Sequence, residues 1–283
     1  MKTLIRTMQV EDVDFGASLA QSVGWISQEK VVFEIFRGKD PDGCFLAEQE
    51  GKPVGMIIAT QYVKSGYLGT LIVQESPRGA GIGPELLLHA IEFLKSRGVE
   101  SIYLDAAPKA VPLYLRNGFQ PISPTLRFDG TCMAHPHPQV RPMLQPDLDQ
   151  VFSLDRTAFG VDRSYFLEKR FQYWPKACIV YLEKGKVVGF ITGRHFPGGV
   201  TVGPWIVTDD VENPLSMLQA LAMFSGESVL HMSVLERNAA AIKLLRDSGF
   251  HERDDTHMRM VYGRLGTLGQ SSNCFAVGAL SKG

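Results

Sequence analysis

Hydrophobic and polar residues alternate along this 283-residue chain in blocks that predict strands and amphipathic helices in turn. Apolar runs flank the turn residues Glu50-Gly51-Lys52, where glycine supplies the positive φ that a hairpin needs. Residues 67–73 form another apolar run, which predicts a buried strand. Residues 84–97 then carry one apolar helical stripe that ends at Gly98. The stripe consists of Leu86, Leu87, Ala90, Ile91 and Leu94, and predicts a helix packed on the sheet.

This pattern occurs twice. Residues 178–189 resemble residues 44–55 in sequence, at an offset of 134 positions. The Gly-Phe pairs near the ends of the two copies, at 118–119 and 249–250, lie 131 positions apart. Each copy predicts a strand, helices, a hairpin, and then strand, helix, strand and helix. Because the period has the size of a domain, the sequence indicates two copies of one fold and not a solenoid.

A proline-spaced segment joins the copies. Four prolines mark this segment, and two histidines stand among them: Pro121, Pro124, His135, Pro136, His137 and Pro138. A histidine pair without a third ligand is typical of a linker and not of a metal site. We therefore expect a first domain at residues 1–128, a Pro/His linker at 129–138 and a second domain at 139–283.

Closely spaced glycines follow the strand at 67–73. The segment consists of Arg78, Gly79, Ala80, Gly81, Ile82 and Gly83. A strand that ends in glycines and turns directly into a helix lets backbone NH groups approach an anion, and the helix N-terminus adds partial positive charge. Since Arg78 adds a full charge at the rim, the segment predicts a site for a pyrophosphate.

Two other nucleotide-binding loops fit this segment less well. A Walker A loop ends in Gly-Lys-Ser/Thr, whereas Gly83 is followed by Pro84 and Glu85. A dinucleotide loop needs a third glycine where Leu86 stands, although Asp105 lies 22 residues after Gly83, near the expected ribose-binding position. That loop also usually opens its domain, and more than sixty residues precede it here. A dinucleotide-dependent oxidoreductase remains a weaker alternative.

The pattern Arg78-x-x-Gly81-x-Gly83, between a strand and an amphipathic helix, resembles the acyl-CoA loop of the GNAT (Gcn5-related N-acetyltransferase) superfamily. Residues 112–119, which include Tyr114, resemble the Leu-Tyr-x-x-x-Gly-Phe ending of that domain. The resemblance implies the mixed α/β (α+β) class: two tandem GNAT folds, each a mixed, mostly antiparallel twisted sheet flanked by helices. It also implies acetyl-CoA or another acyl-CoA as co-substrate.

The second copy lacks the loop. Residues 208–217 carry no glycine and place Asp209 and Asp210 near the position of Arg78, so a pyrophosphate would be repelled. Leu245 stands in place of Tyr114. One acyl-CoA site in the first half is therefore expected, which leaves substrate shaping, interdomain packing or homodimer formation to the second. This arrangement resembles a bacterial type with an active GNAT domain followed by a divergent one, as in the holothin acyltransferases.

The resemblance assigns roles to residues of the first copy. Backbone NH groups of Leu71, Ile72 and Val73 would face the thioester carbonyl and the pantetheine, where geometry matters more than side-chain identity. Tyr114 would be the general acid, because a phenol with a pKa near 10 can protonate a leaving thiolate. Trp25 would border the acceptor groove, either stacking on substrate or packing in the core or an interface.

The general base is open. The strand at 67–73 carries no Asp, Glu or His, and Asp105 is the nearest plausible carboxylate. A water chain, or an acid from the second copy, is an alternative, and an amine of low pKa needs no strong base. From the second copy, Asp162 and Arg163 either point into the acceptor cleft or form an internal ion pair.

Composition limits the partners and the compartment. A formal net charge of −1 provides no basic excess for nucleic acid. Because the N-terminal segment lacks a signal-peptide core and no apolar run is long enough for a bilayer, we expect a cytoplasmic protein without membrane contact. The four cysteines are scattered, which indicates neither metal nor disulfides. The sequence predicts an acyl-CoA-dependent N-acyltransferase for a small-molecule amine, with a CoA-binding regulator or pseudoenzyme as the alternative.

Overall fold

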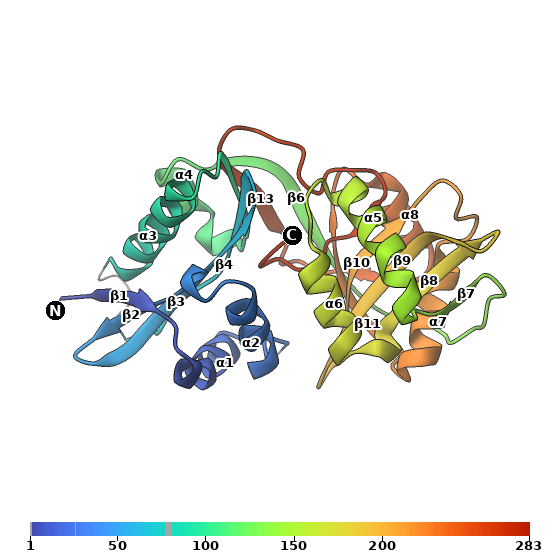
Figure 1. Cartoon of the computed structure of the whole chain (residues 1–283), viewed down its shortest axis with the longest axis horizontal. Helices are drawn as coiled ribbons and strands as arrows, with labels where there is room; N and C mark the ends of the chain where they lie inside the picture. The colour runs from blue at the N-terminus through green and yellow to red at the C-terminus, as the bar shows by residue number, and fades with distance from the viewer. Residues whose placement is uncertain (1, 26, 77–80) are drawn as a thin grey trace. The chain divides into compact units, whose positions relative to one another are not determined.

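The protein divides into two compact units, each with its own strands and helices (Figure 1). The computed structural model describes residues 2–25, 27–76 and 81–283. Unit 1 contains Met1–Ile122, Arg259–Leu265 and Lys282. Unit 2 contains Ser123–Met258, Gly266–Ser281 and Gly283. Each unit is therefore built from segments that lie far apart in the sequence.

This division differs from the linear scheme of two domains and a linker. The expected boundary after residue 128 falls inside β6 (Gln120–Thr131), whose residues from Thr125 onward pair with a strand of unit 2. The prolines at 121 and 124 stand near the start of β6, where a missing NH is tolerated, so they do not end the strand. Most of β13 (His257–Gly263) belongs to unit 1, although it lies in the second half of the sequence.

Unit 1 has a mixed sheet in the order β1-β2-β3-β4-β5-β13. Its other strands are β1 (Leu4–Thr7), β2 (Cys44–Gln49), β3 (Lys52–Tyr62), β4 (Ser65–Val73) and β5 (Ser101–Ala106). Strands β1 to β4 pair antiparallel, and β4 pairs parallel with β5. The expected mixed, mostly antiparallel sheet is confirmed.

Helices cover this sheet on both faces (Figure 1). They are α1 (Val13–Ser22), α2 (Lys30–Lys39), α3 (Ile82–Ser96) and α4 (Val111–Arg116). Helix α3 packs on β2, β3 and β4, and α1 packs on β3 and β4. The predicted stripe of α3 is buried throughout, because its apolar residues recur at the spacing that faces the sheet.

Unit 2 repeats this plan, with the strand order β6-β11-β10-β9-β8-β7, β12 beside β6 and β14 beside β10. The strands are β7 (Val140–Pro142), β8 (Cys178–Glu183), β9 (Lys186–Phe196), β10 (Gly199–Val207), β11 (Val229–Leu235), β12 (His251–Glu252) and β14 (Cys274–Ala276). Strands β10 and β11 are parallel, as β4 and β5 are in unit 1. The duplication seen in the sequence thus extends to the topology.

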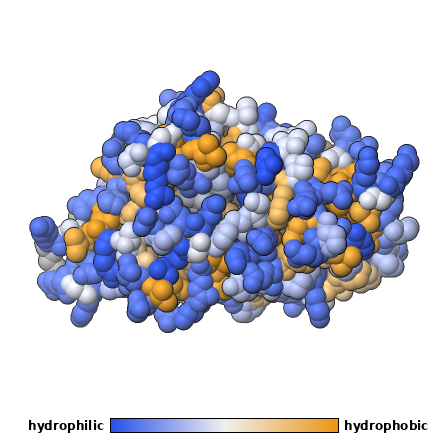
Figure 2. All heavy atoms as spheres, viewed as in Figure 1, coloured by the Kyte–Doolittle hydropathy of each residue, from blue (hydrophilic) through white to orange (hydrophobic). Residues whose placement is uncertain are grey.

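Four helices complete unit 2: α5 (Leu148–Phe159), α6 (Ser164–Tyr173), α7 (Leu215–Ser225) and α8 (Ala239–Asp247). Two apolar clusters hold them on the sheet. One contains buried residues of α7 and α8 with the fully buried Trp205, and the other contains residues of α5 and α6 with Phe190. On the face of the molecule shown in Figure 2, hydrophobic side chains form small patches among hydrophilic ones. None of the helices in the described ranges combines the length and hydropathy that a bilayer crossing requires.

The strand β14 fills the space between β10 and β11. Direct pairing of β10 with β11 covers only residues 200–202 and 230–232, after which β14 pairs with β10, with Ala276 opposite Trp205. On its other side, the Val277 NH donates to the Ser233 carbonyl of β11 at 2.9 Å. The Asn238 amide donates to the carbonyls of Ser272 and Cys274, at 2.9 Å each. The second copy therefore closes the gap with its own chain.

We predict that Asn238→Ala destabilises unit 2 by about 2 to 4 kcal/mol. The substitution removes the side-chain cap on the Ala241 NH and leaves the carbonyls of Ser272 and Cys274 without this donor, the second of them buried. Asn238→Ser is the matched variant, because its hydroxyl keeps a cap acceptor and loses only the amide donors; its effect should lie between. Urea unfolding followed by tryptophan fluorescence measures both, and an Ala variant as stable as the parent would contradict the assignment.

Candidate active site

The parallel pair β4 and β5 separates early. The two strands pair only through residues 65–67 and 101–103. Beyond this point β4 carries a bulge, because Ile58 faces Gly69 whereas Met56 faces Ile72, so β4 has one residue more than β3. Thr70 lies in the bulge with φ of 57°, which is rare for a β-branched residue. A bulge of this kind re-aims backbone groups out of the ladder and is typical of functional sites.

The bulge contains an unsatisfied polar atom. Among the described residues none hydrogen-bonds the buried hydroxyl oxygen of Thr70. Leu71 lies within the bulge, and Ile72 and Val73 resume pairing with β3. These are the three residues whose NH groups were expected to face a thioester. The strained backbone and the orphaned hydroxyl fit a site that a ligand with polar groups completes.

The described end of the glycine loop lies beside β4. Gly81 caps α3 with φ of 84°, and a Cβ built on Gly83 would lie 3.9 Å from Cγ2 of Val73, the last residue of β4. The first turn of α3 leaves backbone NH groups without intrahelical partners, next to the end of this strand. Arg78, Gly79 and Ala80 lie outside the described residues. The segment from Gly81 to Gly83 has the strand, glycine and helix geometry that an anion site needs.

Tyr114 lies in α4 with its ring edge against Phe119, at 5.6 Å between centroids. Its side chain is buried, and this burial raises the pKa of the phenol well above its ordinary value. No residue in the described part of the chain hydrogen-bonds its hydroxyl. Tyr114 therefore keeps its proton at neutral pH, and its hydroxyl can donate a hydrogen bond that none of the described residues accepts.

Side chains of unit 1 bind the Asp105 carboxylate. Its carboxylate pairs with Arg259, at 2.7 Å from Nη2 to Oδ2 and 3.1 Å from Nε to Oδ1, and it also accepts a hydrogen bond from the Tyr67 hydroxyl. The side chains of Asp105 and Arg259 are both 0% exposed. A carboxylate in this position does not face solvent or an incoming amine, so the structure gives no support to Asp105 as a general base.

The sequence signal for this cluster was present but incomplete. Arg259 interrupts an apolar strand between Met258 and Met260, which indicates a buried charge with a partner. Its partner Asp105 precedes it by 154 residues, and local patterns do not reveal a pair at that separation.

The expected acceptor residues have separate environments. Trp25 follows α1 in unit 1 and is 36% exposed, so it is not a core residue. In unit 2, Asp162 accepts a hydrogen bond from the Ser164 NH at the start of α6 and pairs with Arg156. Arg163 is buried, forms a bidentate pair with Asp155 and stacks on the Phe159 ring at 3.5 Å. Of the two interpretations of Arg163, the internal ion pair is the one that the geometry favours.

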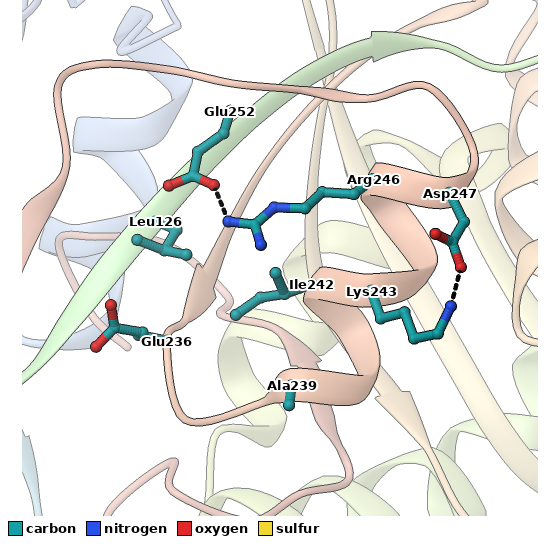
Figure 3. A pocket seen from close by; sticks show the side chains of 8 residues that line it. All are labelled: Leu126, Glu236, Ala239, Ile242, Lys243, Arg246, Asp247 and Glu252. Atoms are coloured by element: carbon teal, nitrogen blue, oxygen red, sulfur yellow. Dashed lines mark hydrogen bonds and ion pairs between the residues drawn. The ribbon is translucent and has the colours of Figure 1, made fainter.

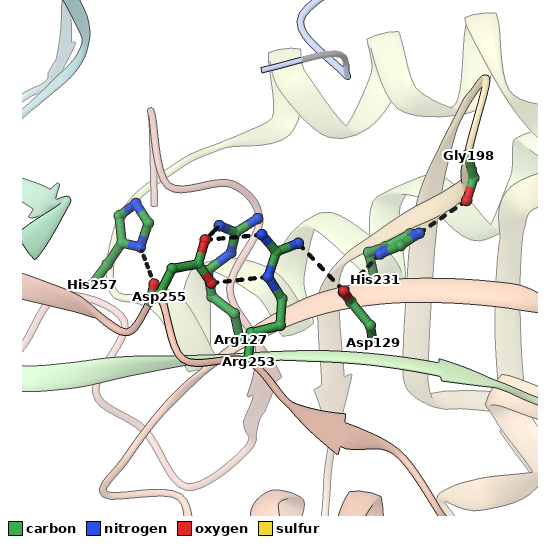
Figure 4. Close-up of polar contacts among 7 residues, drawn as sticks. All are labelled: Arg127, Asp129, Gly198, His231, Arg253, Asp255 and His257. Carbon is green, nitrogen blue, oxygen red and sulfur yellow. Dashed lines mark hydrogen bonds and ion pairs between the residues drawn. The ribbon is translucent and has the colours of Figure 1, made fainter. Parts of the chain in front are cut away.

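Unit 2 has polar features of its own. Figure 4 shows Asp255 accepting from Arg127 and Arg253, while Asp129 lies 2.7 Å from Nδ1 of His231. Figure 3 shows a pocket of about 430 Å³ beside α8, whose wall includes the ion pairs Arg246–Glu252 and Lys243–Asp247. No cluster of three His, Cys, Asp or Glu side chains suited to a metal occurs in the described ranges.

Family models match both halves of the chain. The model described as Acetyltransferase (GNAT) family matches residues 10–119, and the one described as Acetyltransferase (GNAT) domain matches residues 151–276. The chain belongs to the GNAT superfamily. It contains two GNAT domains, as the sequence predicted.

Curated relatives match parts of this GNAT protein. The N-alpha-acetyltransferase MAK3 of Arabidopsis thaliana is 37% identical over 86 residues, which cover 28% of this chain and 45% of that protein. The glucosamine 6-phosphate N-acetyltransferase of Trypanosoma brucei brucei is 28% identical over 92 residues, covering 30% of this chain and 63% of that protein. The chain thus spans less than two thirds of the length of these relatives.

Solved structures match almost the whole GNAT chain. A protein from Pyrococcus horikoshii superimposes with a TM-score of 0.81 at 24% identity, covering 99% of this chain and 96% of that one. The tandem GNAT protein from the clavulanic acid biosynthesis pathway has a TM-score of 0.67 at 14% identity, covering 93% and 98%. At these identities the likeness establishes the fold alone.

The two GNAT domains differ at the opening between the parallel strands. In unit 2 the opening between β10 and β11 contains β14. In unit 1 the strand order of the described residues has no strand between β4 and β5 beyond their short pairing. In unit 2 the chain's own β14 therefore takes a position for which the described residues of unit 1 supply no strand.

We predict that Tyr114 makes no contribution to the alkaline titration of the folded protein near pH 10. Burial disfavours the phenolate, so the raised pKa keeps the phenol protonated to higher pH. Absorbance at 295 nm, recorded for the parent and for Tyr114→Phe from pH 8 to 11, gives the difference curve. A tyrosine step with an ordinary midpoint in that curve would show that the ring is solvated.

Proposed function

We propose that this protein is an acyl-CoA-dependent N-acyltransferase that uses acetyl-CoA in unit 1 to acylate the amine of a small molecule. The observation that carries the proposal is the bulge at Thr70, placed where β4 leaves β5 and beside the N-terminus of α3. Together these elements offer backbone donors for a strand-like chain and for a pyrophosphate. The same unit holds Tyr114 with its hydroxyl unoccupied.

Each part of unit 1 has a role in this proposal. Acetyl-CoA supplies an acetyl group activated as a thioester. The first turn of α3 and Arg78 bind its pyrophosphate, and backbone NH groups of Leu71, Ile72 and Val73 hold the pantetheine and the carbonyl oxygen. Those NH groups stabilise the negative charge that develops on this oxygen when the amine attacks. Tyr114 donates its proton to the departing thiolate.

The proposal assigns no side-chain base. Residues 68–73 of β4 carry no ionisable side chain, and Asp105 is held by Arg259. The amine therefore arrives neutral or loses its proton to water. An acceptor whose amine has a low pKa suits this arrangement best, because a useful fraction of it is neutral at physiological pH.

The relatives support the donor more than the acceptor. By their names, one is an N-alpha-acetyltransferase and the other is an N-acetyltransferase of glucosamine 6-phosphate. The common element is acetyl transfer to nitrogen. The small-molecule acceptor is our inference, and Trp25, exposed after α1, is the residue we propose to border it.

The ion pair between Asp105 and Arg259 favours a second function, because it leaves no side-chain base assigned. A protein that binds acyl-CoA without a base in reach would act as a CoA-responsive regulator or pseudoenzyme. The two proposals differ in turnover and agree on binding. Release of free thiol from acetyl-CoA with a broad amine panel would decide for the enzyme, and binding without thiol release for the regulator.

We predict that Gly81→Glu abolishes acetyl-CoA binding in calorimetry, because it adds a carboxylate at the anion site. Gly98→Glu is the matched control: Gly98 follows the other end of α3 with φ of 78°, close to the 84° of Gly81, so both variants carry similar backbone strain. Gly98→Glu should bind as the parent does. Equal affinities in all three proteins would contradict the site.

We predict that Tyr114→Phe lowers kcat about a hundredfold and leaves the affinity for acetyl-CoA nearly unchanged, since the phenol acts only on the leaving group. Tyr262→Phe is the control, because the Tyr262 ring also packs on Phe119 and has no part in the reaction. A Tyr114→Phe variant with weaker binding and normal kcat would refute the general-acid role.

A further inference from the structure

Three buried side chains meet where β4 and β5 part. Tyr67 is the last residue of β4 that pairs with β5, opposite Tyr103. Its hydroxyl reaches Asp105, two positions further along β5, so a side-chain bridge continues the connection after backbone pairing stops. Arg259, on β13, holds both oxygens of Asp105 from the neighbouring strand. We call Tyr67, Asp105 and Arg259 the buried triad.

Stability alone is a weak explanation for the triad. Desolvating two charges costs several kcal/mol per ion, and apolar replacements of a buried pair are often neutral or stabilising. The Arg259 guanidinium and the Asp105 carboxylate have no exposed surface, and the Tyr67 ring is fully buried. In some proteins a buried polar group of this kind specifies one geometry among alternatives.

Unit 2 provides an internal comparison. The offset of 134 that relates the copies places Thr201 at the position of Tyr67, and Thr201 pairs with His231 as Tyr67 pairs with Tyr103. Two residues after His231 stands Ser233, at the position of Asp105. The GNAT sheet of unit 2 thus forms without a tyrosine and a carboxylate at these positions. Unit 2 also differs in the gap between its parallel strands β10 and β11, because β14 fills that gap.

We propose that Arg259 is a positioning residue for the acyl-CoA site of unit 1. It fixes Asp105, Asp105 fixes the Tyr67 hydroxyl, and this chain of contacts sets the separation of β4 and β5 and the position of the bulge at Thr70. The second half of the sequence thereby supplies a residue to the site in the first. This inference rests on the proposed function, since it concerns how the same site holds the donor.

The test replaces the triad by apolar residues of similar shape. In the full chain, the triple variant Tyr67→Phe/Asp105→Leu/Arg259→Met leaves no unpaired buried charge, so we expect it to unfold at a temperature near that of the parent. Its Kd for acetyl-CoA should rise about tenfold or more, because a small misplacement of the binding groups is costly. The KM for the amine should stay within twofold of the parent.

The control is Arg127→Met. Arg127 lies on β6 opposite Ser233 and pairs with Asp255 in unit 2, so its loss removes an arginine–aspartate pair that is not part of the buried triad. We expect its Kd for acetyl-CoA to equal that of the parent. A tenfold loss in this variant as well would overturn the assignment of the effect to the triad.

The outcomes separate this inference from the proposed function. If the parent does not bind acetyl-CoA, the proposed function fails, and the inference with it. If the parent binds and a stable triple variant binds equally well, only the inference fails. Should the triple variant not fold, Tyr67→Phe decides, because it keeps the packed ring and removes only the bridge; a Kd within twofold of the parent would then overturn the inference.

Discussion

The short pairing of β4 with β5 is the constraint on which the rest of the site depends. Backbone NH and CO groups in a buried sheet need partners, so a gap between two parallel strands has to be filled. Unit 2 fills its gap with β14, which bonds to both β10 and β11. Unit 1 has the bulge at Thr70 in place of such a strand. The same topological problem thus has two solutions in one chain, and the proposed function assigns a ligand to the gap of unit 1.

The two units do not coincide with the two halves of the sequence, because each unit contains a segment from the other half. Unit 1 takes Arg259 from the second half of the sequence, and unit 2 takes the paired part of β6 from the first. Neither half of the sequence therefore contains a whole sheet. Arg127 and Arg259 stand at similar places in these two strands, yet they meet different partners, Asp255 and Asp105.

The sequence predicted what local patterns determine. The stripe of α3, the turn at Gly51 and the repeat of 134 residues follow from periodicity and turn chemistry, and the structure confirms them. The extent of β6 was missed, because prolines near a strand end resemble those of a linker. The partner of Asp105 and the place of β14 were missed because both depend on contacts between segments far apart in sequence. Such contacts leave no periodic signal.

The ion pair between Asp105 and Arg259 removes the nearest carboxylate from consideration as a general base in unit 1. A GNAT reaction needs an acceptor nitrogen with a free electron pair, and the groups that the proposed function uses in unit 1 are backbone amides of β4 and the neutral phenol of Tyr114 on α4. All of these stabilise or protonate; none of them removes a proton at neutral pH. Under the proposed function these groups act on the acyl donor, and the acceptor amine has to be nucleophilic without a side-chain base. Under the proposed function, selectivity among acceptors then follows amine basicity as well as shape, which favours nitrogen nucleophiles of low pKa over lysine-like amines.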